Sequence, residues 1–167
     1  RVRASDFSET RSILRIERKN SDLNVFEMPP IATAEQFHLF QRYQKSRHND
    51  SGMADMDFGD YQEMVEDTIV KTSIIEFRDD HGALLATSLT DRMGDGFSLC
   101  YSFFDPSFSQ RSLGTHVVIW HIRNAQKLKL EYVYLGYWIE ESQKMSYKKK
   151  FKPLEGLNFS KQIWQDL

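Results

Sequence analysis

The chain has 167 residues, of which 40% are apolar and 28% are charged. This length fits one domain, and the apolar share is too high for an intrinsically disordered chain. No apolar run reaches the roughly 18–20 residues that span a bilayer, so we expect a soluble, cytoplasmic protein without a membrane partner.

The net charge is only −2, but the charged residues are unevenly distributed. Residues 51–100 contain three Lys or Arg and eleven Asp or Glu, whereas residues 101–167 contain ten and six. Five lysines and no acid lie between residues 142 and 152. Such a run is either a solvated surface or a surface that contacts phosphates.

Cys100 is the only cysteine, which excludes an intrachain disulfide and a cysteine-rich metal site. The residue is either a nucleophile or a small core side chain. Its apolar neighbours in residues 97–101 favour the core.

The first 30 residues are predicted to form three short elements. Residues 1–5 form a strand, Ser8 caps a helix that ends near Asn20, and residues 24–28 form a second strand. The double proline that starts at Pro29 ends that strand.

Two helices are predicted next. Thr33 and Gln36 have the spacing of a capping box, which predicts a helix from Thr33 to about His48. A loop follows, and Asp60 is expected to start a shorter helix that carries Tyr61 on its buried side.

Three strands then form a predicted antiparallel meander. Apolar and β-branched residues place these strands at 72–78, 83–90 and 97–105. The turn residues between them place tight connections at 79–82 and 92–96.

The hydrophobic period becomes helical over residues 109–127, where Gly114, Val118 and Ile122 recur on one face. Residues 131–139 are then predicted to form a strand. Because this segment is too apolar to be half exposed, we expect it in the centre of the sheet.

The order of three strands, a helix and a returning parallel strand resembles the acyl-CoA N-acyltransferase (GNAT) fold. This is an α+β fold in which a mixed sheet with an antiparallel meander is flanked by helices. Arg111 and Gly114 match the loop that binds the pyrophosphate of coenzyme A in that fold, but Thr115 stands where a second glycine is expected. The backbone amides at this helix start are still suited to an anion.

Eight segments carry a further resemblance, and they follow one another in register between residues 41 and 153. With this pattern the chain resembles the C-terminal catalytic domain of the aminoacyl-tRNA–protein transferases that act on acidic N-termini. The matching segments are residues 41–48, 52–53, 76–78, 91, 101–106, 112–115, 134–139 and 144–153.

The resemblance implies an enzyme that moves an amino acid from aminoacyl-tRNA to the N-terminal Asp or Glu of proteins and so marks them for N-degron degradation. Leu is favoured over Arg as the transferred residue, because the segments lack long insertions and so look bacterial. Aminoacyl-tRNA is the implied co-substrate, and no metal or other cofactor is expected in this chain.

Members of this family usually carry a cysteine cluster near the N-terminus. We therefore expect residues 1–30 to trail from such a region and residues 31–167 to form the transferase domain.

The acceptor's acidic side chain requires a cation, because a buried carboxylate without a partner is costly. The resemblance assigns this role to Arg47, His48 and Arg78. In the alternative reading His48 is a simple helix-end cation, and Arg78 pairs with Asp79 or Asp80.

The donor's 3′ end brings phosphates, an adenine and the esterified side chain. Cations meet the phosphates, while aromatic rings either stack the base or simply belong to the core. The predicted donor-binding residues are Tyr101, Arg111, Gly114, Tyr137, Trp138, Lys144, Tyr147 and Lys148.

The implied reaction does not require a strong base, since an α-amine has a pKa of about 7.7–8.0. Asp91 and Asp105 are the catalytic candidates that orient or deprotonate the amine, although both also suit the start of a turn. Ser112 either donates to the developing oxyanion or caps the following helix.

Two other functions stay open. The strand order and the Arg111-x-x-Gly114 loop suggest a coenzyme A-dependent acetyltransferase, but the lysine run has no purpose in that chemistry. A non-catalytic reader of acidic N-termini would bind such peptides without binding charged tRNA.

Overall fold

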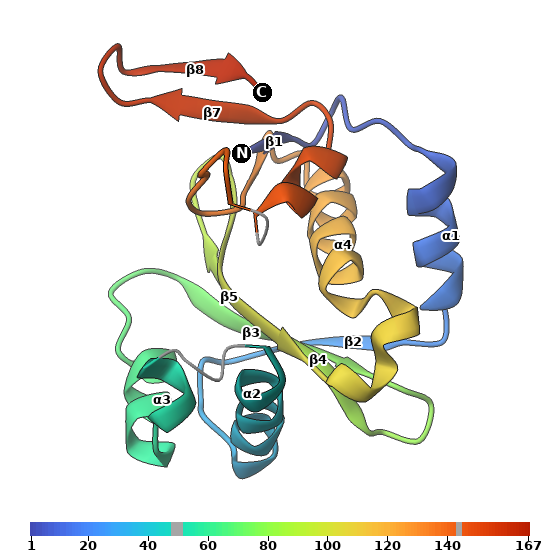
Figure 1. The fold of residues 1–167 in the computed structure, drawn as a ribbon, viewed down its shortest axis with the longest axis vertical. Helices are drawn as coiled ribbons and strands as arrows, with labels where there is room; N and C mark the ends of the chain where they lie inside the picture. Colours follow the sequence, from blue (N-terminus) through green and yellow to red (C-terminus); the bar gives the residue numbers. More distant parts are fainter. Residues whose placement is uncertain (48–51, 143–144) are drawn as a thin grey trace.

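The computed structural model describes residues 1–47, 52–142 and 145–167. A mixed six-stranded sheet forms the centre, with helices on both of its faces (Figure 1). The strand order is β1-β6-β5-β4-β3-β2, and all neighbours are antiparallel except β5 and β6. The strands of this sheet are β1 Val2–Arg3, β2 Asn24–Met28, β3 Thr72–Arg78, β4 Leu84–Arg92, β5 Gly96–Phe104 and β6 Tyr132–Tyr134.

The helices form two layers that cover opposite faces of the sheet (Figure 1). One layer contains α2 and α3, and the other contains α1 and α4. Side chains alternate between the layers along each strand, so Ile74 packs with the α2 cluster while Ile75 packs with α4. The helices are α1 Arg11–Lys19, α2 Ala34–Arg47, α3 Phe58–Glu66 and α4 Leu113–Lys127.

The capping box that predicted α2 is confirmed. The amide of Gln36 donates to Thr33 Oγ1 over 3.2 Å, and the amide of Thr33 donates to Gln36 Oε1 over 3.1 Å. Two other helix starts were predicted wrongly. Thr10 rather than Ser8 caps α1, and Asp57 caps α3 while Asp60 completes its capping box.

The predicted helix over residues 109–127 is in fact two elements. A 3-10 segment, η2 Pro106–Arg111, ends at Ser112, which has φ 55° and ψ 45°, and α4 begins with the next residue. The left-handed conformation of Ser112 breaks the helical path and turns the start of α4 toward β5. The prediction was wrong here because periodicity does not detect a single left-handed residue.

The predicted strand over residues 131–139 is much shorter than expected. Only Tyr132–Tyr134 pair as β6, and Gly136 has φ 74°, which ends the extended path. Tyr137 is 82% exposed and Ile139 53% exposed, so the expectation of a buried central strand was wrong for this part of the chain.

The parallel pairing of β5 with β6 covers only the first part of β5. Gly96, Phe97 and Ser98 pair with β6, and the strand then continues to Phe104 without a partner on that side among the described residues. The antiparallel meander, the crossover through α4 and the parallel return of β6 are the order predicted for the acyl-CoA N-acyltransferase fold. That prediction is confirmed.

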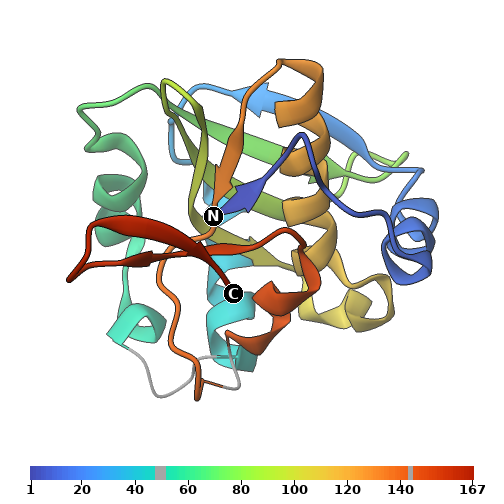
Figure 2. The same ribbon diagram turned by 90° about the horizontal axis from the view of Figure 1, so that it is seen from above.

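Two C-terminal elements were not predicted. A 3-10 segment, η3 Ser146–Lys150, follows the β6 loop, and a separate hairpin of β7 Glu155–Asn158 and β8 Ile163–Asp166 closes the chain. Figure 2 shows the hairpin crossing the end of the molecule beside both termini. Leu154 bridges to Val2 of β1 and joins the hairpin to the sheet.

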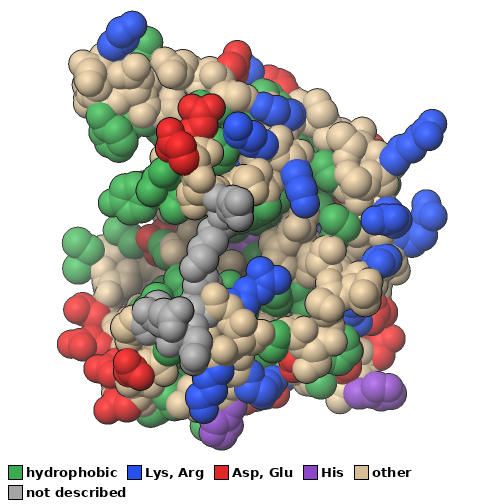
Figure 3. All heavy atoms as spheres, viewed as in Figure 1, with side chains coloured by type: hydrophobic (Ala, Val, Ile, Leu, Met, Phe, Trp, Pro, Cys, Tyr) green, Lys and Arg blue, Asp and Glu red, His purple; other side chains and the backbone are tan. Residues whose placement is uncertain are grey.

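The surface charges follow the uneven distribution found in the sequence. Asp and Glu side chains gather over α3, at the lower left of Figure 3, whereas Lys and Arg dominate the centre and right of this face. Among the described residues no helix is long and apolar enough to cross a membrane.

Candidate active site

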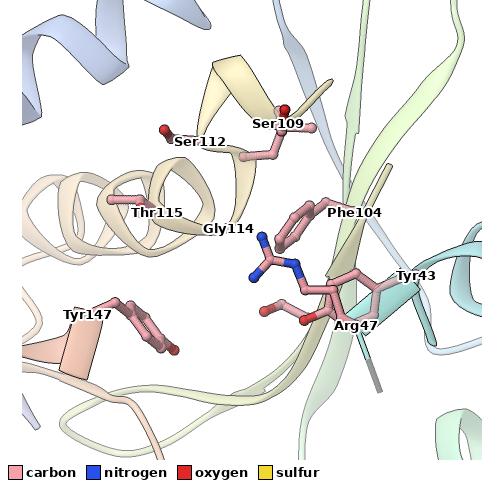
Figure 4. Close-up of a pocket in the computed structure, with 10 residues that line it drawn as sticks. Tyr43, Arg47, Phe104, Ser109, Ser112, Gly114, Thr115 and Tyr147 are labelled. Atoms are coloured by element: carbon pink, nitrogen blue, oxygen red, sulfur yellow. The ribbon is translucent and has the colours of Figure 1, made fainter. Parts of the chain in front are cut away.

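A cavity of about 460 Å³ lies where β5 has separated from β6, and we call it the α4 cavity. Its walls come from the end of α2, the unpaired part of β5, the η2–α4 junction and η3 (Figure 4). The lining residues are Tyr43, Arg47, Ser102, Phe104, Ser109, Ser112, Leu113, Gly114, Thr115 and Tyr147.

Arg47 supplies the cation of the α4 cavity. Its guanidinium carbon lies 5.2 Å from the centre of the Phe104 ring, and Figure 4 shows the group directed toward Phe104 and Gly114. The ion pairs found among the described residues do not include Arg47. The guanidinium is therefore available to an anionic ligand.

The start of α4 forms the opposite wall. The first two amides of the helix, those of Leu113 and Gly114, have no intrahelical acceptor, whereas the amides of Thr115 and His116 both donate to the carbonyl of Ser112. The N-terminal end of the helix dipole also favours negative charge at this place. The anion site expected at Gly114 therefore faces the same cavity as Arg47.

Gly114 is required here by space. A Cβ atom at this position would lie 2.6 Å from Cε1 of Phe104, well inside van der Waals contact. Phe104 is itself held edge-on by Tyr43, with 4.9 Å between the ring centres. Glycine thus lets the helix start approach β5 closely.

Two further predicted residues lie in the same cavity. The side chain of Ser112 makes no capping hydrogen bond to α4, which leaves its hydroxyl available. Tyr147 approaches from η3 on the other side of the cavity (Figure 4). The structure therefore brings Arg47, Ser112, Gly114 and Tyr147 together.

Arg78 is not brought to the α4 cavity. Its guanidinium forms a paired contact with Glu35 over 2.7 and 3.1 Å, donates to Glu76 over 2.9 Å and donates to the carbonyl of Gly82 over 2.8 Å. Its ion-pair partners are thus not Asp79 or Asp80 as in the alternative reading. Because Glu76 is only 5% exposed, Arg78 balances a buried charge and is not free for a substrate carboxylate.

Arg111 is occupied as well. Its guanidinium pairs with Asp22 and donates to Asn20 Oδ1 over 3.0 Å, while its carbonyl accepts from Asn20 Nδ2 over 2.9 Å. These contacts attach the η2 segment to the end of α1. The match to the pyrophosphate loop therefore places Gly114, but not the arginine, at the cavity.

The two aspartates predicted as catalytic lie at opposite ends of β4. The amide of Asp105 donates to the carbonyl of Leu85, near the start of the strand, and Asp91 is six positions after Leu85, roughly 20 Å along an extended chain. One site cannot use both carboxylates. Neither residue lines the α4 cavity.

Each aspartate has local partners. Asp105 accepts from the amide of Ser107 over 2.9 Å and from Arg42 over 2.9 Å; burial opposes the change, but these contacts lower the pKa of Asp105. Asp91 accepts from Thr72 over 2.6 Å and from the thiol of Cys100 over 3.0 Å. These contacts suit the alternative of turn and strand-end residues, and the catalytic role stays a prediction.

Cys100 is exposed, so its expected place in the core was wrong. The residue falls in a bulge of β5, because Leu89 pairs with Tyr101 and Thr90 pairs with Leu99. Although the residue is exposed, its sulfur is partly shielded from water, and this partial burial and the neighbouring Asp91 raise the pKa of the thiol to about 11. The thiolate that a nucleophile requires is therefore scarce at neutral pH.

A second cavity, of about 750 Å³, lies between the loop after β6 and the β7–β8 hairpin, and we call it the hairpin cavity. Tyr137 and Trp138 line it, together with Trp164 of the hairpin. These two predicted rings thus lie in a different cavity from Arg47 and Gly114. Ser98 of β5 lines the hairpin cavity, and Ser102 of the same strand lines the α4 cavity. Both cavities are therefore lined by β5.

Lys148 lines the hairpin cavity but is only 7% exposed. Its ammonium group donates to the carbonyls of Leu135 and Tyr137, each over 2.6 Å. The expectation that Lys148 meets phosphates at the surface was therefore wrong, because the side chain is directed into the protein.

Three predicted site residues remain, namely Tyr101, His48 and Lys144. Tyr101 is half-buried in the α2 cluster, and its hydroxyl accepts from Gln44 over 2.7 Å. His48 and Lys144 lie outside the described residues. In the described part of the chain no group of three or more His, Cys, Asp or Glu is arranged to hold a metal ion.

The model of the family described as arginine-tRNA-protein transferase, C terminus, matches residues 35–158. These residues include every wall of the α4 cavity. The chain belongs to this family.

Curated relatives in the family are similar over nearly the whole chain. An aspartate/glutamate leucyltransferase of Paramagnetospirillum magneticum is 52% identical over 155 residues, which are 93% of this chain and 64% of that protein. Another, of Granulibacter bethesdensis, is 49% identical over 167 residues, which are 100% of this chain and 62% of that protein. The chain thus spans less than two thirds of the length of these relatives.

Among solved structures, that of L-PGS from Bacillus licheniformis matches with a TM-score of 0.57 and 12% sequence identity. The match covers 99% of this chain and 56% of that one. At this level of identity the match supports the fold of the family member and nothing about its chemistry.

Sequence reasoning gave no role to several residues of the α4 cavity. Tyr43 lies four residues before Arg47, a spacing that places both on one face of α2. This signal was readable from the sequence. The contribution of Phe104 was not, because only the folded sheet shows that β6 leaves this part of β5 uncovered.

Proposed function

We propose that this chain is the transferase part of an enzyme that moves leucine from aminoacyl-tRNA to the N-terminal Asp or Glu of proteins, which marks those proteins for degradation. The observation that carries the proposal is the α4 cavity, where the cation of Arg47 faces the free amides at the start of α4. The names and identities of the curated relatives support leucine as the transferred residue.

In the proposed reaction the acceptor's free α-amine attacks the ester carbonyl of the aminoacyl-tRNA. A carbon–nitrogen bond forms, the bond to the ribose oxygen breaks, the amine loses a proton and the ribose hydroxyl leaves with one. Because the ester is already activated, positioning and stabilisation of the oxyanion supply most of the acceleration.

The lining residues of the α4 cavity suit these needs. Arg47 pairs with the acceptor's side-chain carboxylate, which selects Asp and Glu over neutral residues. The amides of Leu113 and Gly114, with the hydroxyl of Ser112, donate to the oxyanion as it forms. Charged tRNA is a cytoplasmic molecule, so we place the reaction in the cytoplasm.

A parallel transfer assay tests the proposal. The chain is mixed with tRNA charged with radiolabelled Leu or Arg, or with labelled acetyl-CoA, and with peptides that differ only in an N-terminal Asp, Glu or Ala. We expect transfer of Leu to the Asp and Glu peptides but not to the Ala peptide.

The full-length relative from Paramagnetospirillum magneticum is the positive control in this assay. If the relative transfers Leu and this chain does not, the chain by itself is not the transferase. Acetyl transfer would support the acetyltransferase alternative instead. Tight binding of the Asp peptide without binding of charged tRNA would support the non-catalytic reader.

A further inference from the structure

Lys148 is a buried cation at the boundary between the two cavities. It belongs to η3, where its neighbour Tyr147 lines the α4 cavity while Lys148 itself lines the hairpin cavity. Lys148 and Glu76 are the two charged side chains in the buried part of the described chain. Glu76 has the opposite charge of Arg78 as its partner, and the two residues differ in this respect.

No carboxylate balances Lys148 among the described residues, and its only hydrogen-bond acceptors there are two backbone carbonyls. Burial accordingly lowers the pKa of its ammonium group. A buried charge without an opposite charge is costly, and a methionine of similar shape would avoid that cost. The lysine therefore has a purpose that an apolar side chain of the same size cannot serve.

That purpose is visible in what the two hydrogen bonds hold. The carbonyls belong to Leu135 and Tyr137, on either side of Gly136 with its φ of 74°. One ammonium group thus fixes three consecutive residues directly after the short strand β6. Residues 135–139 have no strand partner among the described residues, so these two bonds replace the missing sheet contacts.

The held segment carries two aromatic rings, of which Tyr137 is exposed to solvent and Trp138 is half-buried. Tyr137 is 82% exposed although its own carbonyl is fixed by Lys148. Trp138 lies beside it, with Lys149 Nζ 5.4 Å from the centre of its ring. An exposed ring and a half-buried ring on a fixed backbone, next to a cation, are an arrangement on which single-stranded nucleic acid bases stack.

We propose that Lys148 is a positioning residue that holds Tyr137 and Trp138 as a stacking surface for the terminal bases of the aminoacyl-tRNA. This inference rests on the proposed function. Lys148 itself does not touch the tRNA, because its ammonium group is buried against the two carbonyls. Loss of the lysine frees the 135–139 segment and weakens donor binding without changing acceptor binding.

The first test compares K148M with K150M. Both variants remove one positive charge from η3, but Lys150 is exposed, so it can act only through long-range attraction. K148M is expected to raise the KM for Leu-tRNA about tenfold at every salt concentration, the size of one lost stacking contact. K150M is expected to raise it two- to threefold at low salt and not at high salt. The KM for the acceptor peptide stays unchanged in both.

The second test is a double-mutant cycle with Tyr137. Y137A changes an exposed side chain and so leaves the fold intact. If Lys148 acts through this ring, K148M/Y137A binds Leu-tRNA no more weakly than the weaker single variant. The proposal would be overturned if the affinity losses of K148M and Y137A multiplied in the double variant. It would also be overturned if the K148M effect disappeared at high salt, because the lysine would then act as a phosphate contact.

Hydrogen exchange and equilibrium binding separate this proposal from the proposed function. K148M is expected to accelerate amide exchange in residues 135–141 and not in α2 or β3, and to bind charged tRNA more weakly in a filter assay without turnover. If wild-type protein binds charged tRNA but transfers nothing, the proposed function fails and this inference stands. Unchanged exchange or unchanged tRNA binding in K148M would overturn the inference.

Discussion

Arg47 and Arg78 carry the same guanidinium, but the two regions around them differ. Arg78 lies on β3 in the antiparallel part of the sheet, where Glu35, Glu76 and a turn carbonyl satisfy it. Arg47 lies at the end of α2 beside the uncovered edge of β5, where its guanidinium lies near the ring of Phe104 and has no carboxylate partner among the described residues. The comparison teaches that the strand pairing around an arginine, more than the residue itself, decides whether it can receive a ligand.

The difference between the two arginines is tested most directly by replacing each of them with a neutral residue. R47Q is expected to lower kcat/KM for an Asp-terminated peptide about 10- to 100-fold, because hydrogen bonds to a charged group contribute roughly 1.5–3 kcal/mol. Its discrimination between Asp- and Asn-terminated peptides should also disappear. Steady-state transfer assays with both peptides measure these effects.

R78Q is the matched variant. It is expected to lower the free energy of unfolding by about 3 kcal/mol, because Glu76 is left buried without its partner. Urea denaturation measures this loss, and transfer by the folded fraction should change less than threefold. The assignment of the two arginines would be reversed if R78Q abolished transfer while R47Q left it intact.

A second prediction concerns a buried histidine of α4. His121 of α4 is fully buried and contacts Thr90 of β4 over 3.0 Å, and burial lowers its pKa to about 4 from an ordinary value of 6.5. The unfolded chain therefore binds a proton first as the pH falls. The contribution of neutral His121 to the free energy of unfolding is complete above about pH 6.5. It decreases by about 3 kcal/mol as the pH falls toward 4.

Urea denaturation at pH 7.0, 5.5 and 4.5 measures this dependence. His116 has a similarly lowered pKa of about 4, so H121L should show about half of the wild-type slope between pH 6.5 and 4.5. An unchanged slope in H121L would show that this histidine is not the group that titrates.

A third prediction concerns the close approach of α4 to β5 at Gly114. G114A places a Cβ atom 2.6 Å from the Phe104 ring and is expected to cost about 1–3 kcal/mol of stability through overpacking. Because that ring also lies under Arg47, transfer should fall about tenfold.

The double variant G114A/F104L removes the clash and should recover most of the lost stability, which thermal unfolding measures. If G114A alone is as stable as wild type, the contact between α4 and β5 is looser than the structure indicates.

The smallest effect is expected at the bulge of β5. C100S should leave transfer and stability within experimental error, since the thiol is protonated at neutral pH and exposed. The rate of alkylation of wild-type protein by iodoacetamide should rise steadily toward pH 11. Loss of transfer in C100S would instead support Cys100 as a nucleophile.

Much of this protein was determined by its sequence alone. The capping box at Thr33, the alternation of the three meander strands and the helical period around Gly114 are local patterns, so α2, β3, β4, β5 and most of α4 could be predicted. The segments of the family resemblance likewise named Arg47, Ser112, Gly114 and Tyr147, all of which line one cavity.

Other features depend on contacts between distant residues, which only the tertiary structure decided. The left-handed Ser112, the early end of β6 and the burial of Lys148 each arise where a segment meets a neighbour that local periodicity does not reveal. The same is true of the ion pairs that occupy Arg78 and Arg111. A sequence states which side chains are charged or aromatic, but whether they face a ligand depends on where the strands stop pairing.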